Sequence, residues 1–204
     1  MKRILVISFT LLLFCIGIFS QDVEDDHEYA AIKQEHFDYF DWKYNDAITG
    51  KPINLRQFSQ GKKLVMVFYL APWCHNSRYE LIQTEKLYQK YKNAGFAVIG
   101  VSLYGDKERT ARMFEVYGAT FPVVVESESS KDRKKTPHYK YRRKMKDDRK
   151  WGTPWIVYLK PDEFETGGTL LTKNPFVAAG ETTETDAVNF IEQVFKKSKP
   201  TYEN

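Results

Sequence analysis

Cysteine is the scarcest informative residue in this chain. The 204 residues contain two, Cys15 and Cys74, and Cys15 falls in an N-terminal segment with the features of a cleaved leader. Removal of that leader would leave Cys74 alone, which excludes an internal disulfide in the mature chain. A lone cysteine in an exported protein indicates intermolecular pairing or a free reactive thiol. The alternative is a buried and inert cysteine, which is common in globular cores.

Long apolar runs are also rare, and the one that stands out is at the N-terminus. Lys2 and Arg3 precede an almost wholly apolar stretch from residue 4 to 19, and Ser20 provides a small residue before an acidic segment. This order predicts a secretory signal peptide over residues 1–20 and therefore a periplasmic or secreted protein. An uncleaved membrane anchor is the alternative, although the run is short for a full span. A lipid-anchored Cys15 is disfavoured because bulky Phe14 precedes it.

Metal-ligand patterns and internal repeats are missing as well. His27, His36 and the acidic residues between 21 and 36 have a spacing that fits no known ligand pattern, so we expect no metal site and no cofactor. The net charge of +4 and the 42% apolar content indicate one ordinary globular domain without global disorder.

The rest of the chain alternates apolar runs with helical periodicity. We expect a flexible acidic segment at 21–36 and a domain at 37–198, with a turn at 49–52 between two short extended pieces. The later hydrophobic pattern predicts a mixed α/β sheet covered on both faces. Its buried strands are expected at 63–70, 96–103, 121–126 and 152–162, a closing strand or hairpin at 167–180, and helices at 75–92, 110–117 and from about 187 onward.

The first buried strand ends in the sequence "FYLAPWCHNSRYE", which places Cys74 where a strand hands over to a helix. The unpaired amides of a helix N-terminus favour negative charge, and a thiol held there loses its proton more easily. Ser77 follows on the first helical turn, from which its hydroxyl is expected to donate a hydrogen bond to the thiolate, and Arg78 adds positive charge. Trp73 is expected to shield the thiol and His75 to lie exposed beside it, although His75 is equally well explained as a simple polar position.

This segment resembles the active site of the thioredoxin superfamily, and "APWC" is also similar to protein disulfide isomerases. "DAITGKPINLRQFSQGKKLVMVFYLAPWC" resembles the opening of TlpA/ResA-like redoxins, while "YGATFPVVVE" and "GTPWIVYL" fall where that family has its third strand and its cis-proline strand. The resemblance implies a thioredoxin-like fold over about residues 40–197, with Cys74 as nucleophile. It also implies that Thr153 and Pro154 form the cis-proline pair facing that cysteine, with Thr153 offering its backbone to an extended substrate. Trp151 and Trp155 flank this strand, and at least one of them is expected in the core.

Three departures from the family pattern affect the expected chemistry, two of them close to Cys74. Ser77 replaces the resolving cysteine, so an attack on a disulfide can occur but release of the mixed disulfide must come from outside. Phe68 stands six residues before the nucleophile, where the family often has a buried acid or amide. A peroxiredoxin reading is disfavoured because Ala71 occupies the threonine position of that family and Pro72 lies too close to Cys74.

The third departure is a charged insert at 127–150, before the cis-proline strand. Residues 130–150 hold eleven Lys or Arg against three Asp, a balance of +8, so the rest of the chain sums to −4. Thr136 and Pro137 are expected to cap and start a short helix on which Tyr141 and Met145 stack. The insert is predicted to be a solvated, partly disordered loop, or alternatively a docking surface for an acidic partner beside Cys74.

The sequence thus predicts an exported monothiol redoxin that forms mixed disulfides with a thiol-bearing protein or a small thiol. The alternative is a non-catalytic binding module that docks a partner through the cis-proline groove and the basic insert. Neither reading includes a nucleic-acid partner, and a membrane is involved only if the signal stays uncleaved.

Overall fold

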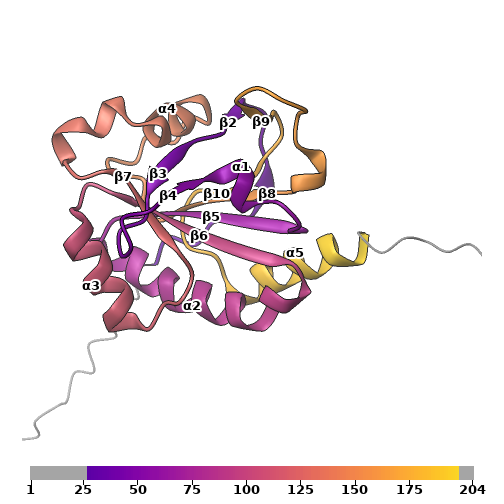
Figure 1. Cartoon of the computed structure of the whole chain (residues 1–204), viewed down its shortest axis with the longest axis horizontal. Helices are drawn as coiled ribbons and strands as arrows, with labels where there is room; N and C mark the ends of the chain where they lie inside the picture. The colour runs from indigo at the N-terminus through magenta and orange to yellow at the C-terminus, as the bar shows by residue number, and fades with distance from the viewer. Residues whose placement is uncertain (1–26, 198–204) are drawn as a thin grey trace, which may run out of the picture.

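The computed structural model describes residues 27–197, so the predicted signal peptide at 1–20 lies outside the described residues. Within this range the chain folds around one mixed sheet of six strands with helices on both sides (Figure 1). The predicted α/β class with a covered mixed sheet is confirmed. The helices and strands have the following bounds: β1 Lys33–Gln34, β2 Tyr39–Phe40, β3 Lys43–Asn45, β4 Pro52–Asn54, α1 Leu55–Phe58, β5 Leu64–Leu70, α2 His75–Tyr91, β6 Phe96–Leu103, α3 Lys107–Tyr117, β7 Val123–Ser127, α4 Pro137–Lys144, β8 Trp155–Leu159, β9 Leu170–Thr172, β10 Phe176–Ala178 and α5 Glu184–Lys197.

The order of strands in the main sheet is β1-β10-β8-β5-β6-β7. Strands β5, β6 and β7 are parallel, and β8 pairs antiparallel with β5, so the strand after Thr153–Pro154 lies directly beside the strand that leads to Cys74. The β5–β8 register aligns Tyr69 with Trp155. Because the two strands are adjacent and antiparallel, the end of β5 and the start of β8 meet at one edge of the sheet.

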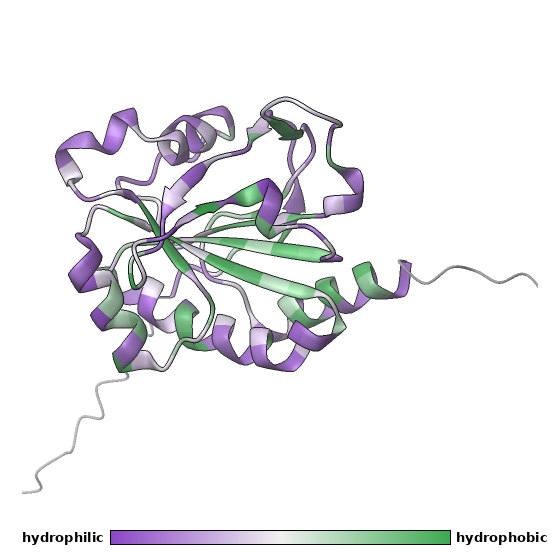
Figure 2. Cartoon of the chain, in the orientation of Figure 1, coloured by the Kyte–Doolittle hydropathy of each residue, from purple (hydrophilic) through white to green (hydrophobic). Residues whose placement is uncertain are grey.

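Two hydrophobic cores lie on the two faces of the sheet. Side chains alternate along β5, so Met66 and Phe68 enter one core while Val67 and Tyr69 enter the other. Helices α2, α3 and α5 cover the first face, and α1, α4 and the small β2–β9 sheet cover the second (Figures 1 and 2). Burial on both faces explains why β5 and β6 are continuous apolar runs rather than alternating ones.

The helices around the sheet begin and end at identifiable residues. Asp106 caps α3 by accepting a hydrogen bond from the Arg109 amide at 2.8 Å, and Gly118 ends it with a positive φ of 68°. The stripe of Ala187, Ile191 and Val194 buries one side of α5 against the first core. Burial of a large apolar side chain of this kind contributes about 1.5–3 kcal/mol.

The segment before the predicted domain is ordered where the structure describes it. Residues 33–34 form the edge strand β1, which pairs with β10, and the Ala30 amide donates a hydrogen bond of 2.8 Å to the Glu181 carbonyl. The prediction of a flexible segment at 21–36 is therefore wrong for residues 27–36. The polar side chains of this segment do not predict a strand, because its contacts with the sheet are hydrogen bonds between backbone groups.

The basic insert is a folded connection rather than a solvated loop. Thr136 caps α4 and Pro137 starts it, as predicted, and α4 packs on the second face of the sheet. Tyr141, His138 and Arg142 are all at least 95% buried there. The connection from β7 to β8 must cross the sheet, and α4 supplies the cover for the face that it crosses.

Of the closing strand or hairpin expected at 167–180, the structure contains a closing strand and no hairpin. Strand β10 joins the main sheet beside β8, but β9 pairs with β2, in the small sheet over the second core. The two strands therefore belong to different sheets despite the short link between them.

Candidate active site

Cys74 lies at the junction predicted from the sequence, as the N-cap residue of α2. Its backbone is extended, with φ −79° and ψ 123°, and its amide donates a hydrogen bond of 2.9 Å to the Ala71 carbonyl. The side chain is partly exposed, and the thiol is free. The first turn of α2 contains no acidic residue, so the helix dipole there is not offset by a carboxylate of its own.

The Cys74 thiol points at the start of β8. Its Sγ donates a hydrogen bond of 3.4 Å to the Thr153 carbonyl, and the Thr153–Pro154 peptide bond is cis. The structure therefore brings Cys74, Thr153 and Pro154 together although they lie far apart in the sequence. Thr153 itself is nearly buried, and its hydroxyl has no hydrogen-bond partner among the described residues.

Ser77 lies fully buried on the first turn of α2, inside the molecule. Its hydroxyl oxygen accepts a hydrogen bond of 3.3 Å from the Ala71 amide. The sequence predicts instead that this hydroxyl donates a hydrogen bond to the Cys74 thiolate. The observed bond fixes the loop between β5 and α2, so Ser77 holds that loop where a resolving cysteine would otherwise stand.

Trp73 and His75 flank the thiol on the exposed side. The Trp73 indole is 40% exposed, donates a hydrogen bond of 3.1 Å from Nε1 to the Tyr104 carbonyl, and meets Trp151 edge to face at 5.1 Å. His75 is exposed and stacks with His27 at 6.4 Å. Of the two tryptophans near the cis-proline strand, Trp151 thus lines the site, while Trp155 is fully buried in the second core.

The basic connection reaches the rim of the site, as predicted. The Arg133 guanidinium and the Lys150 ammonium lie over the Trp151 ring at 5.4 and 5.1 Å from its centroid. Both are within the range of a cation–π contact. Positive charge therefore stands next to the Trp73–Trp151 pair.

A buried polar network that the sequence does not predict supports the loop before Thr153. The Arg142 guanidinium donates to the Trp151 carbonyl at 3.0 Å and pairs with Asp147 at 2.9 Å, while Arg149 pairs with the same carboxylate at 2.9 Å. Burial alone raises the pKa of Asp147, but hydrogen bonds from Arg149 and Arg142 outweigh it and hold that pKa well below its usual value. Asp147 is therefore a permanent anion at neutral pH.

His138 extends this network as a neutral side chain. Burial, together with the nearby Arg142 charge, lowers its pKa well below the usual value. Its Nε2 lies 3.2 Å from the Gly152 carbonyl, and since a carbonyl only accepts, Nε2 carries the proton. The His138 amide donates to Glu126 at 3.2 Å, and burial raises the pKa of Glu126 to about 7.

Glu80 is a second buried acid that sequence reasoning missed. It lies on the buried face of α2, two turns beyond Cys74, and accepts hydrogen bonds from the Thr182 amide at 3.0 Å and the Thr182 hydroxyl at 2.9 Å. Burial raises its pKa to about 8 despite these bonds. The spacing of three residues from Cys74 to Ser77 and from Ser77 to Glu80 places all three on one face of the helix, which is the sequence feature that indicates the burial of Glu80.

The two histidines weighed as metal ligands bond to other groups. His27 Nδ1 contacts Glu181 at 2.9 Å, and His36 Nδ1 contacts Asn174 at 2.8 Å. Residues 27–197 contain no group of three potential ligands that would hold a metal ion.

A strand that leads to a cysteine at the N-terminus of α2, faced by a cis-proline strand, is the arrangement that the resemblance to TlpA/ResA-like redoxins implies. The AhpC/TSA family model matches residues 35–146, more than half of the chain. The chain therefore belongs to the AhpC/TSA family.

Two thiol-disulfide oxidoreductases are similar to part of the chain. The chain is 30% identical over 79 residues to the thiol-disulfide oxidoreductase ResA of Halalkalibacterium halodurans, which covers 39% of this chain and 44% of that protein. It is 25% identical over 118 residues to ResA of Oceanobacillus iheyensis, covering 57% and 60% respectively. The alignments thus span less than two thirds of either relative.

A solved structure supports the fold at low sequence identity. A secreted thiol-disulfide isomerase from Corynebacterium glutamicum superposes with a TM-score of 0.56 and 15% identity, covering 80% of this chain and 92% of that one. At this identity the likeness concerns the fold.

Proposed function

We propose that this protein is an exported monothiol redoxin that exchanges thiols and disulfides through mixed disulfides at Cys74. The observation that carries the proposal is the pairing of a free, partly exposed Cys74 thiol with the Thr153 carbonyl at 3.4 Å. The sulfur stands beside the Thr153 backbone, and the resemblance to TlpA/ResA-like redoxins assigns that backbone to an extended substrate. The two ResA relatives, named thiol-disulfide oxidoreductases, support the same chemistry.

The proposed reaction has two external partners. The Cys74 thiolate attacks a disulfide R–S–S–R′, a bond forms between Cys74 and R–S, and R′–S⁻ leaves and takes a proton from water. Because Ser77 cannot attack the new disulfide, a second thiol from outside must do so and regenerate Cys74. The protein therefore acts in exchange or capture, with no net change of its own redox state.

The test is formation of the mixed disulfide. The mature chain is incubated with bis(2-hydroxyethyl) disulfide, a neutral probe, and the adduct is measured by intact mass, with Cys74→Ser as the matched control. We expect one adduct at Cys74 that external thiol removes completely. A native protein whose Cys74 stays unmodified while the unfolded protein reacts would overturn the proposal.

Export is part of the proposal and rests on the N-terminal sequence. Within residues 27–197 no helix is both long and apolar enough to cross a bilayer, and the Corynebacterium glutamicum neighbour is described as secreted. Expression with the native N-terminus and mass analysis of the exported chain should give a protein that begins at Gln21. Recovery of the full-length chain in the membrane fraction would favour the uncleaved anchor.

A second candidate function is a binding module without redox turnover. The observation that favours it is the buried Ser77, whose hydroxyl secures the active-site loop through the Ala71 amide without contributing a second thiol. In this reading the basic residues near Trp151 hold an acidic partner. Partner binding that survives Cys74→Ser, in a protein that forms no mixed disulfide, would select this alternative.

A further inference from the structure

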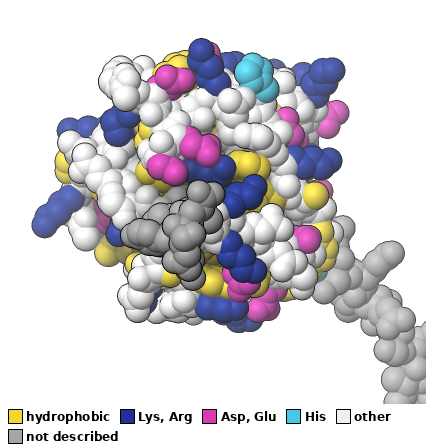
Figure 3. Space-filling model, turned by 90° about the vertical axis from the view of Figure 1, so that its right-hand side faces the viewer, with side chains coloured by type: hydrophobic (Ala, Val, Ile, Leu, Met, Phe, Trp, Pro, Cys, Tyr) yellow, Lys and Arg dark blue, Asp and Glu magenta, His cyan; other side chains and the backbone are white. Residues whose placement is uncertain are grey.

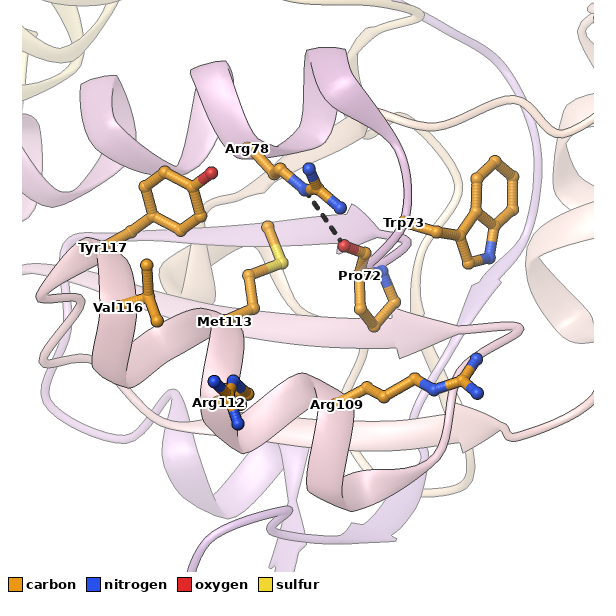
Figure 4. Close-up of a pocket in the computed structure, with 8 residues that line it drawn as sticks. All are labelled: Pro72, Trp73, Arg78, Arg109, Arg112, Met113, Val116 and Tyr117. Carbon is orange, nitrogen blue, oxygen red and sulfur yellow. Dashed lines mark hydrogen bonds between the residues drawn. The ribbon is translucent and has the colours of Figure 1, made fainter.

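A groove lined by three arginines begins at the active-site loop, on the side away from the basic connection. It has a volume of about 310 Å³ and lies between the start of α2 and the exposed side of α3 (Figure 4). The lining residues are Pro72, Trp73, Arg78, Arg109, Arg112, Met113, Val116 and Tyr117. Pro72 and Trp73 immediately precede Cys74, so the groove starts within two residues of the nucleophile.

We propose that this groove binds an acidic segment next to the reactive cysteine of a partner protein. The inference rests on the proposed function, since it identifies the class of substrate that Cys74 would attack. It places recognition on α2 and α3, whereas the sequence predicted an acidic partner on the basic connection.

Charge is the first argument for this occupant. The groove is lined by no acidic side chain, and Figure 4 shows Arg78 facing it from α2 while Arg109 and Arg112 extend from α3. Within residues 27–197 neither Arg78 nor Arg112 forms an ion pair, and Arg109 has an exposed partner in Asp106 at 3.3 Å. The acidic residues of α3, Glu108 and Glu115, line a neighbouring hollow, which Arg109 and Arg112 also border.

Several cations of the basic connection are, in contrast, already engaged. Arg142 and Arg149 share the Asp147 carboxylate, Lys135 pairs with Asp132 at 2.9 Å, and Arg133 lies over Trp151. At the opposite end of the molecule, where β5 and β6 begin, basic and acidic side chains are interspersed (Figure 3). The arginine groove thus combines two arginines without an ion pair among residues 27–197 with a hollow that starts at the active-site loop.

Shape is the second argument. Met113, Val116 and Tyr117 give the groove an apolar wall, on which Val116 is 66% exposed. From Arg109 to Tyr117 the wall of α3 is about 12 Å long at 1.5 Å per residue. That length matches about three or four residues of an extended chain.

Arg78 connects the groove to the active-site loop. Its Nε donates a hydrogen bond of 3.2 Å to the Pro72 carbonyl, which holds the guanidinium over the loop (Figure 4). An extended partner whose sulfur meets Cys74 would therefore pair its backbone with Thr153 on one side and place the following acidic residues in the groove on the other.

The experiment compares two cysteine peptides that differ only in charge. Each has three residues after the cysteine, acidic in one peptide and the corresponding amides in the other, and each is supplied as a mixed disulfide with 2-mercaptoethanol. The rate constant for transfer of the peptide to Cys74 is divided by that for neutral bis(2-hydroxyethyl) disulfide, which cancels any change in the reactivity of the thiol itself. We expect the acidic peptide to react at least tenfold faster at low ionic strength, with the advantage shrinking as salt increases.

Two matched variants locate the effect. Arg109→Glu with Arg112→Glu should abolish the preference, whereas Lys140→Glu with Arg143→Glu, the same change of charge on exposed positions of α4, should preserve it. Equal rates for the two peptides in the native protein, or an equal loss in both double variants, would overturn the proposal. Arg78 is left unchanged because its bond to Pro72 shapes the loop.

A binding measurement separates this inference from the proposed function. Serine versions of both peptides are titrated into the Cys74→Ser protein by calorimetry, so no disulfide chemistry is involved. Binding of the acidic peptide that Arg109→Glu with Arg112→Glu abolishes would support the groove even if Cys74 proved unreactive. Absence of any charge preference in binding as well as in rate would reject it.

Discussion

The guanidinium group of Arg142 occupies the space where a side chain at Gly152 would begin. A Cβ atom built on Gly152 would lie 1.7 Å from Arg142 Cζ, and Gly152 adopts a positive φ of 63°. This close approach lets Arg142 reach the Trp151 carbonyl, one residue before Gly152 and two before Thr153. A side chain buried under α4 thereby shapes the backbone that faces the Cys74 thiol.

Gly152→Ala should therefore destabilise the protein through two separate effects. A left-handed conformation costs about 1–2 kcal/mol for a residue with a Cβ, and forcing Arg142 aside adds about 1–3 kcal/mol of overpacking. We expect a loss of about 2–5 kcal/mol in the free energy of unfolding, measured by urea denaturation. Gly167→Ala is the control, since Gly167 has a φ of 76° but no atom within 4 Å of its Cβ position. A loss no larger than that of the control would show that Arg142 moves aside freely.

Asp147→Asn tests the charge that compensates Arg142. Both side chains are nearly inaccessible, with 7% and 1% exposure, so removing the carboxylate leaves a buried guanidinium unpaired. We expect a loss of about 3–5 kcal/mol in unfolding free energy at pH 7. Asp148→Asn, at the exposed neighbouring position, should change stability by less than about 0.5 kcal/mol.

The same pair predicts how stability depends on acid. The pKa of Asp147 is lowered in the folded protein, so its contribution is present above the ordinary carboxyl pKa of 3.8 and is lost as the pH falls below that value. The difference in unfolding free energy between the native protein and Asp147→Asn should therefore shrink below about pH 4. A difference that is constant from pH 7 to pH 3 would contradict the depressed pKa.

The sequence predicted the parts of the site that depend on local pattern. The apolar run of β5, the start of α2 at His75 and the strand after Pro154 all follow from periodicity and from turn residues, and Cys74 accordingly lies where it was expected. The cysteine and the cis-proline strand meet because β5 and β8 are adjacent and antiparallel, so that β5 ends where β8 begins.

The parts that were missed depend on partners brought together by the tertiary fold. In the sequence, Arg142 is one of a run of basic residues and would be expected on the surface. The hydrogen bonds to Asp147 and to the Trp151 carbonyl offset the cost of burying its charge. Glu80 has the sequence pattern of a polar position on an amphipathic helix, but Thr182, in the segment just before α5, donates two hydrogen bonds to it. Local propensities do not encode pairings between residues distant in the sequence, which is why the buried charges are not predicted from it.

Glu80→Gln should alter the pH dependence of stability. Because the folded pKa of about 8 lies above the ordinary value of 4.5, the folded protein holds a proton that the unfolded chain releases between these values. Stability arising from Glu80 is thus present below pH 4.5 and is lost as the pH rises toward 8. Glu80→Gln should lose less stability than the native protein between pH 5 and pH 8, by a few kcal/mol.

The comparison needs a control because Glu126 also has a raised pKa, of about 7. Subtracting the curves of the native protein and the variant removes that contribution, which both share. Glu115→Gln, at an exposed position of α3, should leave the pH profile unchanged. Parallel curves for Glu80→Gln and the native protein would mean that Glu80 is ionised in the folded state.

Ser77→Cys asks whether one residue separates this site from a dithiol enzyme. Residue 77 lies three positions after Cys74 on the first turn of α2, the spacing at which helical side chains are neighbours. We expect the two thiols of the variant to form an internal disulfide on oxidation, seen as a loss of about 2 Da relative to the reduced protein. The variant should then release mixed disulfides without added thiol, which the native chain cannot do.

Two controls distinguish release of the mixed disulfide by the new thiol from an effect of losing the Ser77 hydrogen bond in the loop. Ser77→Ala removes the acceptor for the Ala71 amide and should cost about 1–3 kcal/mol of unfolding free energy without creating a resolving thiol. Cys74→Ser combined with Ser77→Cys keeps a thiol at position 77 and should form no internal disulfide. If Ser77→Cys folds but its mixed disulfides persist as long as those of Ser77→Ala, the obstacle lies beyond the missing cysteine. The next candidate is then the proton acceptor that Phe68, fully buried in the first core, does not provide.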